Sequence, residues 1–140
     1  MQAVWQLQSG PPLAWGNVIY YGNFTDIPLS KDQRSVNLWF NTAGFVTASS
    51  QQLYNNLITF PTLFAGIRSG IYNSWDISAL KNIQIHEKHR FQFRGEFLNV
   101  FNHPTGFAPP NTSPTSSAFG QVTTQYGWPR TIQLGLKYLF

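Results

Sequence analysis

Apolar and polar residues alternate along this sequence, and the alternation restricts the fold more than any other feature. The segment 90–101 is the clearest case. Its aromatic residues occupy one side, Phe91, Phe93, Phe97 and Phe101, and its charged and amide residues the other, Arg90, Gln92, Arg94 and Glu96. Successive side chains of a β-strand point to opposite sides of the sheet. The pattern therefore predicts a strand with one apolar and one polar face.

Three further segments share this period of two, at residues 2–8, 73–85 and 131–140. In the last of them the apolar residues share one face, namely Ile132, Leu134, Leu136, Tyr138 and Phe140, and only Leu139 breaks the pattern. In the segment 73–85 the alternation is interrupted at Leu80 and Lys81, where we expect an irregularity. The sequence thus predicts an all-β fold with about four strands.

The connections between these strands differ greatly in length. Residues 86–89, His-Glu-Lys-His, are short enough for a tight hairpin between antiparallel neighbours. The long connections, residues 9–72 and 102–130, are rich in Gly, Pro, Asn, Ser and Thr, and residues 49–60 could form a short helix. Short turns at one end of a sheet and long loops at the other are typical of outer-membrane barrels. We therefore expect antiparallel strands of a transmembrane β-barrel with two long extracellular loops.

The placement of aromatic and charged residues agrees with a membrane-spanning sheet. Aromatic residues would form one girdle at the periplasmic interface and another near the outer one, as barrels in lipid do. The charged residues of the strands fall on the opposite, lumen-facing side, namely Asp76, Arg94, Glu96 and Lys137. With Lys81 they could form a ladder of ion pairs that holds the strand register, and substrate contact is the less favoured role. A soluble sandwich would also alternate, so the pattern supports a barrel without proving one.

Several classes of function find no support in the sequence. The net charge of +4 comes from scattered residues, which does not indicate a nucleic-acid partner. Cysteine is absent, and the spacing in His86-Glu87-Lys88-His89 is one residue short of the zinc-protease pattern. No acid pair, phosphate loop or nucleophile grouping stands out. We therefore expect no enzyme activity, cofactor or metal site.

The long loops contain many aromatic residues that could stack on a ligand such as a glycan. They are Trp15, Tyr20, Tyr21, Trp39, Tyr54, Tyr126 and Trp128. The same rings could equally pack the loops together, and the sequence does not choose between these roles.

Several stretches resemble the C-terminal end of TonB-dependent outer-membrane receptors. They are NSWDISALKNIQI, RFQFRGEFLNVFNHPTGF, AFGQVTT and PRTIQLGLKYLF, and SGPP and WFNTAGF also look like this group. The likeness is to receptors whose barrels carry an N-terminal carboxypeptidase-regulatory-like domain. It covers most of the chain and is most specific from Trp75 through Pro104. Residues 1–140 would then be one C-terminal barrel segment.

The resemblance implies a barrel of about 22 strands, closed by a plug, in the bacterial outer membrane. Such a receptor takes up a scarce nutrient with energy transmitted through TonB, which would contact the plug. The resemblance also implies that Leu136, Tyr138 and Phe140 form the signal read by the barrel-assembly machinery. The expected partners are outer-membrane lipid and either the remainder of the barrel and its plug or other copies of this chain. The sequence shows no secretory signal, so we expect that it is not a complete precursor.

Open strand edges argue that such a chain does not act alone. Single-chain bacterial barrels begin at about eight strands, and an unpaired edge in lipid leaves backbone groups unsatisfied at several kcal/mol each. Two alternatives remain open. One is a soluble or secreted β-rich module that binds carbohydrate, and the other is a structural oligomer assembled through strand edges.

Overall fold

The chain divides into two compact units. The computed structural model describes residues 1–52, 55 and 57–140. Unit 1 contains Met1–Gln8, Tyr72–Gly106 and Tyr126–Phe140, and unit 2 contains Ser9–Ile71 and Phe107–Gln125. Unit 2 is therefore built almost entirely from the two segments expected to be long loops.

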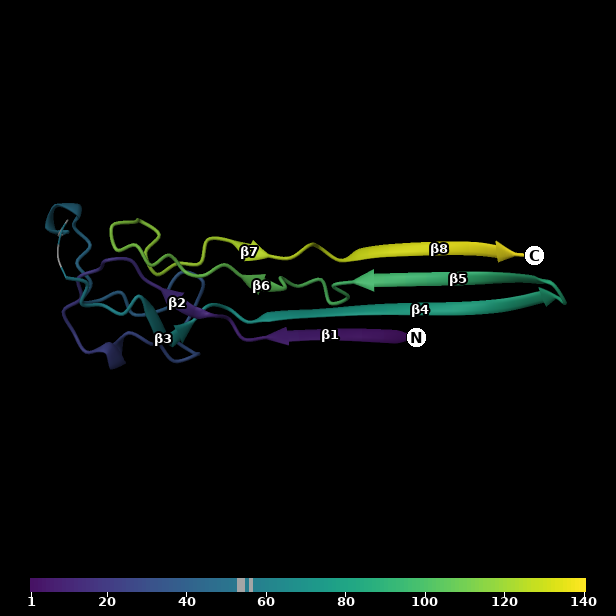
Figure 1. The fold of residues 1–140 in the computed structure, drawn as a ribbon, viewed down its shortest axis with the longest axis horizontal. Helices are drawn as coiled ribbons and strands as arrows, with labels where there is room; N and C mark the ends of the chain where they lie inside the picture. Colours follow the sequence, from purple (N-terminus) through teal and green to yellow (C-terminus); the bar gives the residue numbers. More distant parts are fainter. Residues whose placement is uncertain (53–54, 56) are drawn as a thin grey trace. The chain divides into compact units, whose positions relative to one another are not determined.

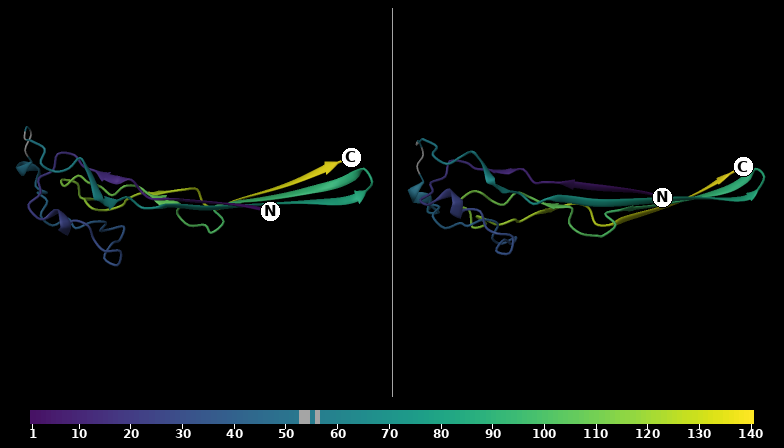
Figure 2. Two further views of the ribbon diagram at one scale, coloured as in Figure 1. Left: turned by 60° about the horizontal axis from the view of Figure 1, so that its bottom comes forward. Right: turned by 90° about the horizontal axis from the view of Figure 1, so that it is seen from below.

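Unit 1 is an antiparallel sheet of four strands (Figure 1). In sheet order these are β1 (Gln2–Gln8), β4 (Tyr72–His86), β5 (His89–Leu98) and β8 (Thr131–Leu139). Each strand pairs with the one that precedes it among these four, and every pairing is antiparallel. Figure 2 shows the four strands as a single layer. The expectation of an all-β fold with antiparallel strands is confirmed.

Strand β5 ends at Leu98, three residues earlier than the alternation of Phe residues suggests. The next residue, Asn99, has a φ of +50°, which leaves the extended conformation. Its backbone N–H donates to Asp76 Oδ1 at 2.9 Å. Phe101 therefore belongs to a turn, although the spacing of aromatic residues continues through it.

Strand β4 runs without interruption through Leu80 and Lys81, so the irregularity expected there is absent. Leu80 pairs with Arg94 and Lys81 pairs with Phe93, and the register shifts only between Gln84 and His86, beside the hairpin turn. Because side chains opposite each other in a ladder share a face, Leu80 lies on the polar face and Lys81 on the apolar face. The ladder of lumenal charges therefore does not include Lys81.

Unit 2 has its own hydrophobic core. Its regular elements are β2 (Pro12–Ala14), paired antiparallel with β3 (Leu63–Arg68), and two 3-10 turns, η1 (Phe24–Asp26) and η2 (Ser49–Gln51). The core consists of buried apolar side chains, namely Leu13, Trp15, Val18, Ile27, Phe40, Phe45, Phe60 and Ile67. Trp15 lies at its centre, with its ring stacked on Phe45 at a centroid distance of 5.2 Å.

The second long segment closes this core against the first. Phe119 packs its ring edge-on to Phe45 at 5.2 Å. Trp39 donates its backbone N–H to Gly120 O at 2.8 Å, and Val122 donates to Val36 O at 2.7 Å. Two segments that look like separate loops in the sequence thus fold as one body.

Within the segment 49–60, where a short helix could be expected, the described residues contain no helix longer than one 3-10 turn. The structure has the single turn η2 at the start of this segment. Leu53, Tyr54 and Asn56 lie outside the described residues. Among the residues that are described, no helix is long and apolar enough to cross a membrane. The remaining strands, β6 (Gly106–Phe107) and β7 (Gln125–Tyr126), pair with each other as a two-stranded ladder.

Candidate functional site

One face of the unit 1 sheet is apolar and open. Cross-strand pairs place its side chains in register, as in Trp5 with Trp75, Phe93 with Leu136 and Phe97 with Ile132. Trp5 and Trp75 stack at 5.2 Å. None of the large apolar side chains on this face is buried, and Leu136 is 69% exposed. A contiguous apolar surface of this kind marks contact with lipid or with another protein.

The polar face carries the four charges predicted to face the lumen, Asp76, Arg94, Glu96 and Lys137. Arg94 forms an ion pair with Glu96 on its own strand. Asp76 instead accepts the backbone N–H of Asn99, and Lys137 lies across the ladder from Gln92. The charges therefore share a face as the alternation requires, but they do not form a continuous ladder of ion pairs.

A pocket of about 230 Å³ opens on this polar face, where β4, β5 and β8 meet the loops. We call it the polar-face pocket. Its walls come from three strands and two loop segments: Tyr72, Ser74, Asp76, Leu98, Asn99, Thr105, Gly127, Trp128, Pro129 and Thr131. Tyr72, Ser74 and Asp76 alternate along β4, so the period of two brings all three side chains to one face.

Asparagine side chains hold the loop around the pocket in place. The buried Asn99 donates its Nδ2 to His103 O at 2.8 Å and to Trp128 O at 2.9 Å. Asn102 Oδ1 accepts the backbone N–H of Arg130 at 2.9 Å. These bonds connect the loop after β5 to the segment before β8. The backbone that carries Trp128 is thus fixed before any ligand arrives.

Next to these hydrogen bonds, position 127 requires a glycine. Its φ is +111°, and a Cβ at this position would overlap Thr105 Oγ1. Thr105 donates both its backbone N–H and its hydroxyl to Tyr126 O, at 3.1 and 3.2 Å. The pocket wall is therefore tightly packed backbone at this point.

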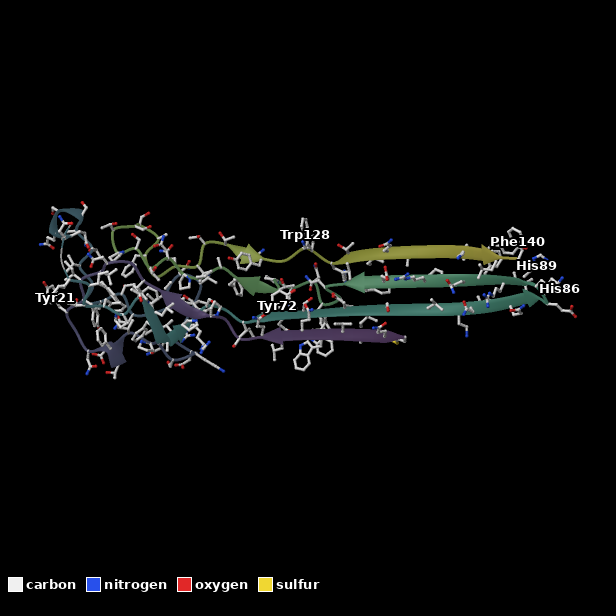
Figure 3. All side chains as sticks on the ribbon, viewed as in Figure 1. Tyr21, Tyr72, His86, His89, Trp128 and Phe140 are labelled. Carbon is white, nitrogen blue, oxygen red and sulfur yellow. The ribbon has the colours of Figure 1, made fainter. Side chains whose placement is uncertain are left out.

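Two aromatic side chains of the pocket remain accessible. Trp128 is 85% exposed and Tyr72 is 38% exposed. Figure 3 shows both at the end of the strands that lies away from His86 and His89. Asp76 Oδ2 has no hydrogen-bond or ion-pair partner among the residues that the structure describes. The pocket therefore offers exposed rings and one unpaired carboxylate oxygen.

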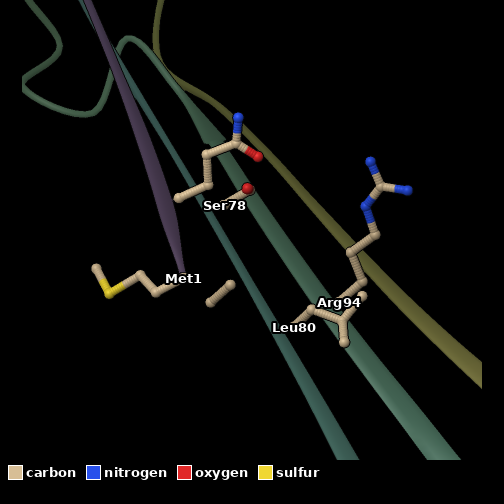
Figure 4. Close-up of a pocket in the computed structure, with 6 residues that line it drawn as sticks. Met1, Ser78, Leu80 and Arg94 are labelled. Carbon is tan, nitrogen blue, oxygen red and sulfur yellow. The ribbon is translucent and has the colours of Figure 1, made fainter.

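A second hollow of about 340 Å³ lies where β1 ends (Figure 4). It is lined by Met1, Gln2, Ser78, Ala79, Leu80 and Arg94. It arises because β1 pairs with β4 only up to Gln2 opposite Ser78, whereas β4 continues to His86. Beyond Ser78, this edge of β4 has no ladder partner within the described part of the chain. The hollow is thus a consequence of an open strand edge.

The aromatic residues proposed to contact a ligand lie in different settings. Trp15 is buried at 5% exposure in the core of unit 2, which gives it a packing role. Trp39 is half-buried and donates Nε1 to Arg68 O at 2.8 Å. Tyr21 and Tyr126 are exposed, and Trp128 lines the polar-face pocket. Tyr54 lies outside the described residues.

The phenol of Tyr20 in unit 2 has a raised pKa. Burial raises its pKa above the usual value of 10.0, and the nearby Asp26 carboxylate raises it further. Its hydroxyl donates to Asn23 O at 2.9 Å. Both effects favour the neutral phenol in the folded unit.

The three residues of the expected assembly signal lie on the apolar side of the C-terminal strand. Leu136 pairs with Phe93 and Tyr138 with Phe91. The Tyr138 hydroxyl contacts His89 Nδ1 at 2.6 Å, and the two rings stack. Phe140 is 90% exposed. This end of β8 is thus attached to the hairpin turn through Tyr138, and the exposed terminal ring lies against Tyr138 at a centroid distance of 5.8 Å.

Sequence reasoning did not identify the residues that shape the pocket, namely Tyr72, Asn99, Asn102 and Thr105. The available signal was the pair of asparagines in LNVFNHP, because Asn tolerates positive φ better than most residues. Asn99 and Asn102 have φ values of +50° and +52°. Within the described ranges, no group of three or more His, Cys, Asp or Glu side chains could hold a metal ion.

The chain matches a known protein family. A family model described as "Outer membrane beta barrel domain" matches residues 1–133. No curated protein and no solved structure matches the chain.

Proposed function

Because this chain belongs to the outer membrane beta barrel domain family, we propose that it forms part of the wall of a TonB-dependent receptor that takes up a nutrient. The family places the chain in the bacterial outer membrane as a β-barrel protein. The resemblance of most of its sequence to the C-terminal end of TonB-dependent receptors supports the more specific role. The proposal assigns no catalytic step to the chain.

The exposed apolar face of the sheet is the observation that carries this proposal. Leu134 and Leu136 in the centre of β8 are 63% and 69% exposed. In water such a surface would be unfavourable by about 25 cal/mol for each Å², whereas hydrocarbon solvates it. The strands β5 and β8 have 10 and 9 residues, close to the length that crosses a bilayer.

The alternative of a soluble carbohydrate-binding sandwich needs these rings inside a core. The core of the chain lies elsewhere, in unit 2, around Trp15, Phe40 and Phe45. The side chains of β5 and β8 contribute nothing to it. The structure therefore gives no support to the soluble alternative.

The topology supports one orientation in the membrane. In this orientation the His86–His89 turn lies in the periplasm, and the opposite ends of the strands, where both long segments begin, face the outside of the cell. The polar face, with Asp76, Arg94 and Glu96, then lines the barrel interior. Tyr138 and Phe140 would meet the assembly machinery from the periplasmic side.

The open edges of the sheet support the need for partner strands. β1 and β8 form the two edges, and neither has a second ladder partner among the described residues. We expect these partners to be further strands of the same barrel or strands of other copies. The plug that contacts TonB would belong to the complete receptor.

Growth experiments test the uptake role. A strain without this gene is compared with its parent on single sources of iron, carbon and cobalamin at limiting concentration. We expect a growth defect on at least one source, and inactivation of TonB should reproduce that defect without adding to it. Normal growth on every source, or a defect that adds to the loss of TonB, would contradict the proposed uptake.

A further inference from the structure

We infer that the polar-face pocket binds an organic ammonium cation, at a site formed by Asp76 and the rings of Trp128 and Tyr72. This inference deepens the proposed function and rests on it in one respect, which is that the polar face lines the path of the nutrient. The argument uses the charge of the pocket, its hydrogen-bonding capacity and its accessible rings.

The pocket carries a single charge. Asp76 is the one ionisable carboxylate among its lining residues, and none of them is Lys, Arg or His. One oxygen of Asp76 accepts the N–H of Asn99, and the other has no partner among the described residues. The neighbouring Glu96 differs, because Arg94 neutralises it. An uncompensated carboxylate in a recess attracts a cation.

Anions are disfavoured because Asp76 gives the pocket a negative charge and several donors of the lining are already engaged. The backbone N–H of Asn99 donates to Asp76, and that of Thr105 donates to Tyr126 O. The hydroxyls of Thr105 and Thr131 donate to Tyr126 O and Pro129 O. A phosphate or carboxylate would therefore meet the negative charge of Asp76, and the donors left to it are side-chain groups such as the hydroxyls of Tyr72 and Ser74.

The accessible rings favour a cation that carries alkyl groups. Trp128 is 85% exposed, although its backbone is fixed by Asn99. The exposed indole ring offers its negative face to a cation, and Trp is the best aromatic partner for one. An alkylammonium group would contact this ring and Tyr72 while its charge faces Asp76. An inorganic ion would not use the rings in this way.

Saturation-transfer NMR on the protein extracted from outer membranes in mild detergent tests this inference. The probe is choline, and the comparison compound is 3,3-dimethylbutan-1-ol, which has the same shape without the charge. We expect transfer to the choline methyl groups at concentrations up to about ten millimolar, and much weaker transfer to the alcohol. Added salt should weaken choline binding, because the ion pair is screened.

Two substitutions locate the site. Trp128→Ala removes an exposed ring, and we expect it to weaken choline binding by about two- to fivefold. Asp76→Asn retains an oxygen for the N–H of Asn99, so we expect the loop to persist while binding weakens and its salt dependence disappears. Phe101→Ala and Glu87→Gln are the matched controls, since both are exposed and lie outside the pocket. Heat-modifiable electrophoretic mobility shows whether each variant still forms a barrel.

The outcomes separate this inference from the proposed function. The inference is wrong if choline and the alcohol bind equally, if neither binds, or if folded Trp128→Ala and Asp76→Asn proteins bind choline as the parent does. Preferential binding of a neutral sugar such as glucose would also overturn it. Choline binding that weakens in both variants supports the inference even if growth never depends on TonB, in which case only the uptake role fails.

Discussion

Arg94 forms its ion pair along β5 because its two cross-strand neighbours, Leu80 and Gly135, carry no charge. Gly135 lies opposite Arg94 and has no side chain to meet it. The guanidinium group therefore contacts Glu96, two residues further along the same face. Arg94 has a 62% exposed side chain, and exposed pairs of this kind contribute about 0–1 kcal/mol. The pair thus neutralises the charge of Glu96 but adds little to the stability of the sheet.

An arginine introduced at two adjacent positions of β8 should change the stability by very different amounts. Leu134 lies on the apolar face at the centre of the strand, and Gln133 lies on the polar face. We expect Leu134→Arg to lower the free energy of unfolding in lipid by about 2–4 kcal/mol, because a cation at the bilayer midplane has this cost. Gln133→Arg should change it by less than about 1 kcal/mol. Urea titration of the protein refolded into lipid vesicles measures both values.

Equal losses of stability in these two variants would show that β8 does not present separate lipid and lumen faces. A small loss in both would place Leu134 in water or in a protein contact. The parent protein and the conservative variant Leu134→Ile serve as controls for refolding yield.

At the scale of elements, unit 2 is a small aromatic core formed by two loop segments. Tyr20 packs its ring against Phe45 at 4.6 Å, at the margin of this core. Because burial holds the Tyr20 pKa above its value in the unfolded chain, the neutral phenol stabilises the fold. This stabilisation is complete below the unfolded pKa near 10 and is lost as pH rises through the higher folded value.

We therefore expect unit 2 to lose stability above about pH 10, in a transition that Tyr20→Phe reduces. Near-ultraviolet circular dichroism at increasing pH follows the aromatic core directly. Tyr21→Phe is the matched control, because the Tyr21 side chain is 75% exposed. If both variants show the same alkaline transition as the parent, ionisation of Tyr20 does not contribute to it.

The strands were predictable from sequence because their pattern is local. The alternation in 90–101 and 131–140 depends only on which face each side chain takes, and the structure pairs these faces as Phe91 with Tyr138 and Phe97 with Ile132. Lys81 shows the limit of this reasoning. A charge in an apolar register suggested an irregular strand, but the ladder to β5 maintains its register through that position.

The pocket and the core of unit 2 depend on contacts that the local pattern does not encode. Asn99 and Trp128 are 29 residues apart and meet through one hydrogen bond. Trp15 and Phe119 belong to different loops and share one aromatic cluster. Composition identified the loops as rich in aromatic residues, but only the structure distinguishes the buried Trp15 from the exposed Trp128.

At the scale of the whole molecule, the unpaired strand edges are the main energetic constraint. β1 and β8 run antiparallel to each other, since each of the three intervening pairings reverses direction. The last strand of one sheet can therefore pair with the first strand of another in an antiparallel ladder, as barrels require. In lipid each unsatisfied backbone group costs several kcal/mol, so we expect the sheet to acquire partner strands before it is stable.

We expect the 140-residue chain, produced alone and refolded in mild detergent, to form complexes of at least two copies. Two copies would supply eight strands, the smallest number in bacterial single-chain barrels. Native mass spectrometry should then show multiples of 15.9 kDa and little monomer. Leu7→Lys is the control for effects that do not depend on the strand edge. It changes the apolar face of β1 without removing a backbone donor. A monomer that folds cooperatively in water without detergent would contradict this prediction. It would mean that the edges are satisfied within one chain, and neither lipid nor partner strands would then be needed to explain its exposed face.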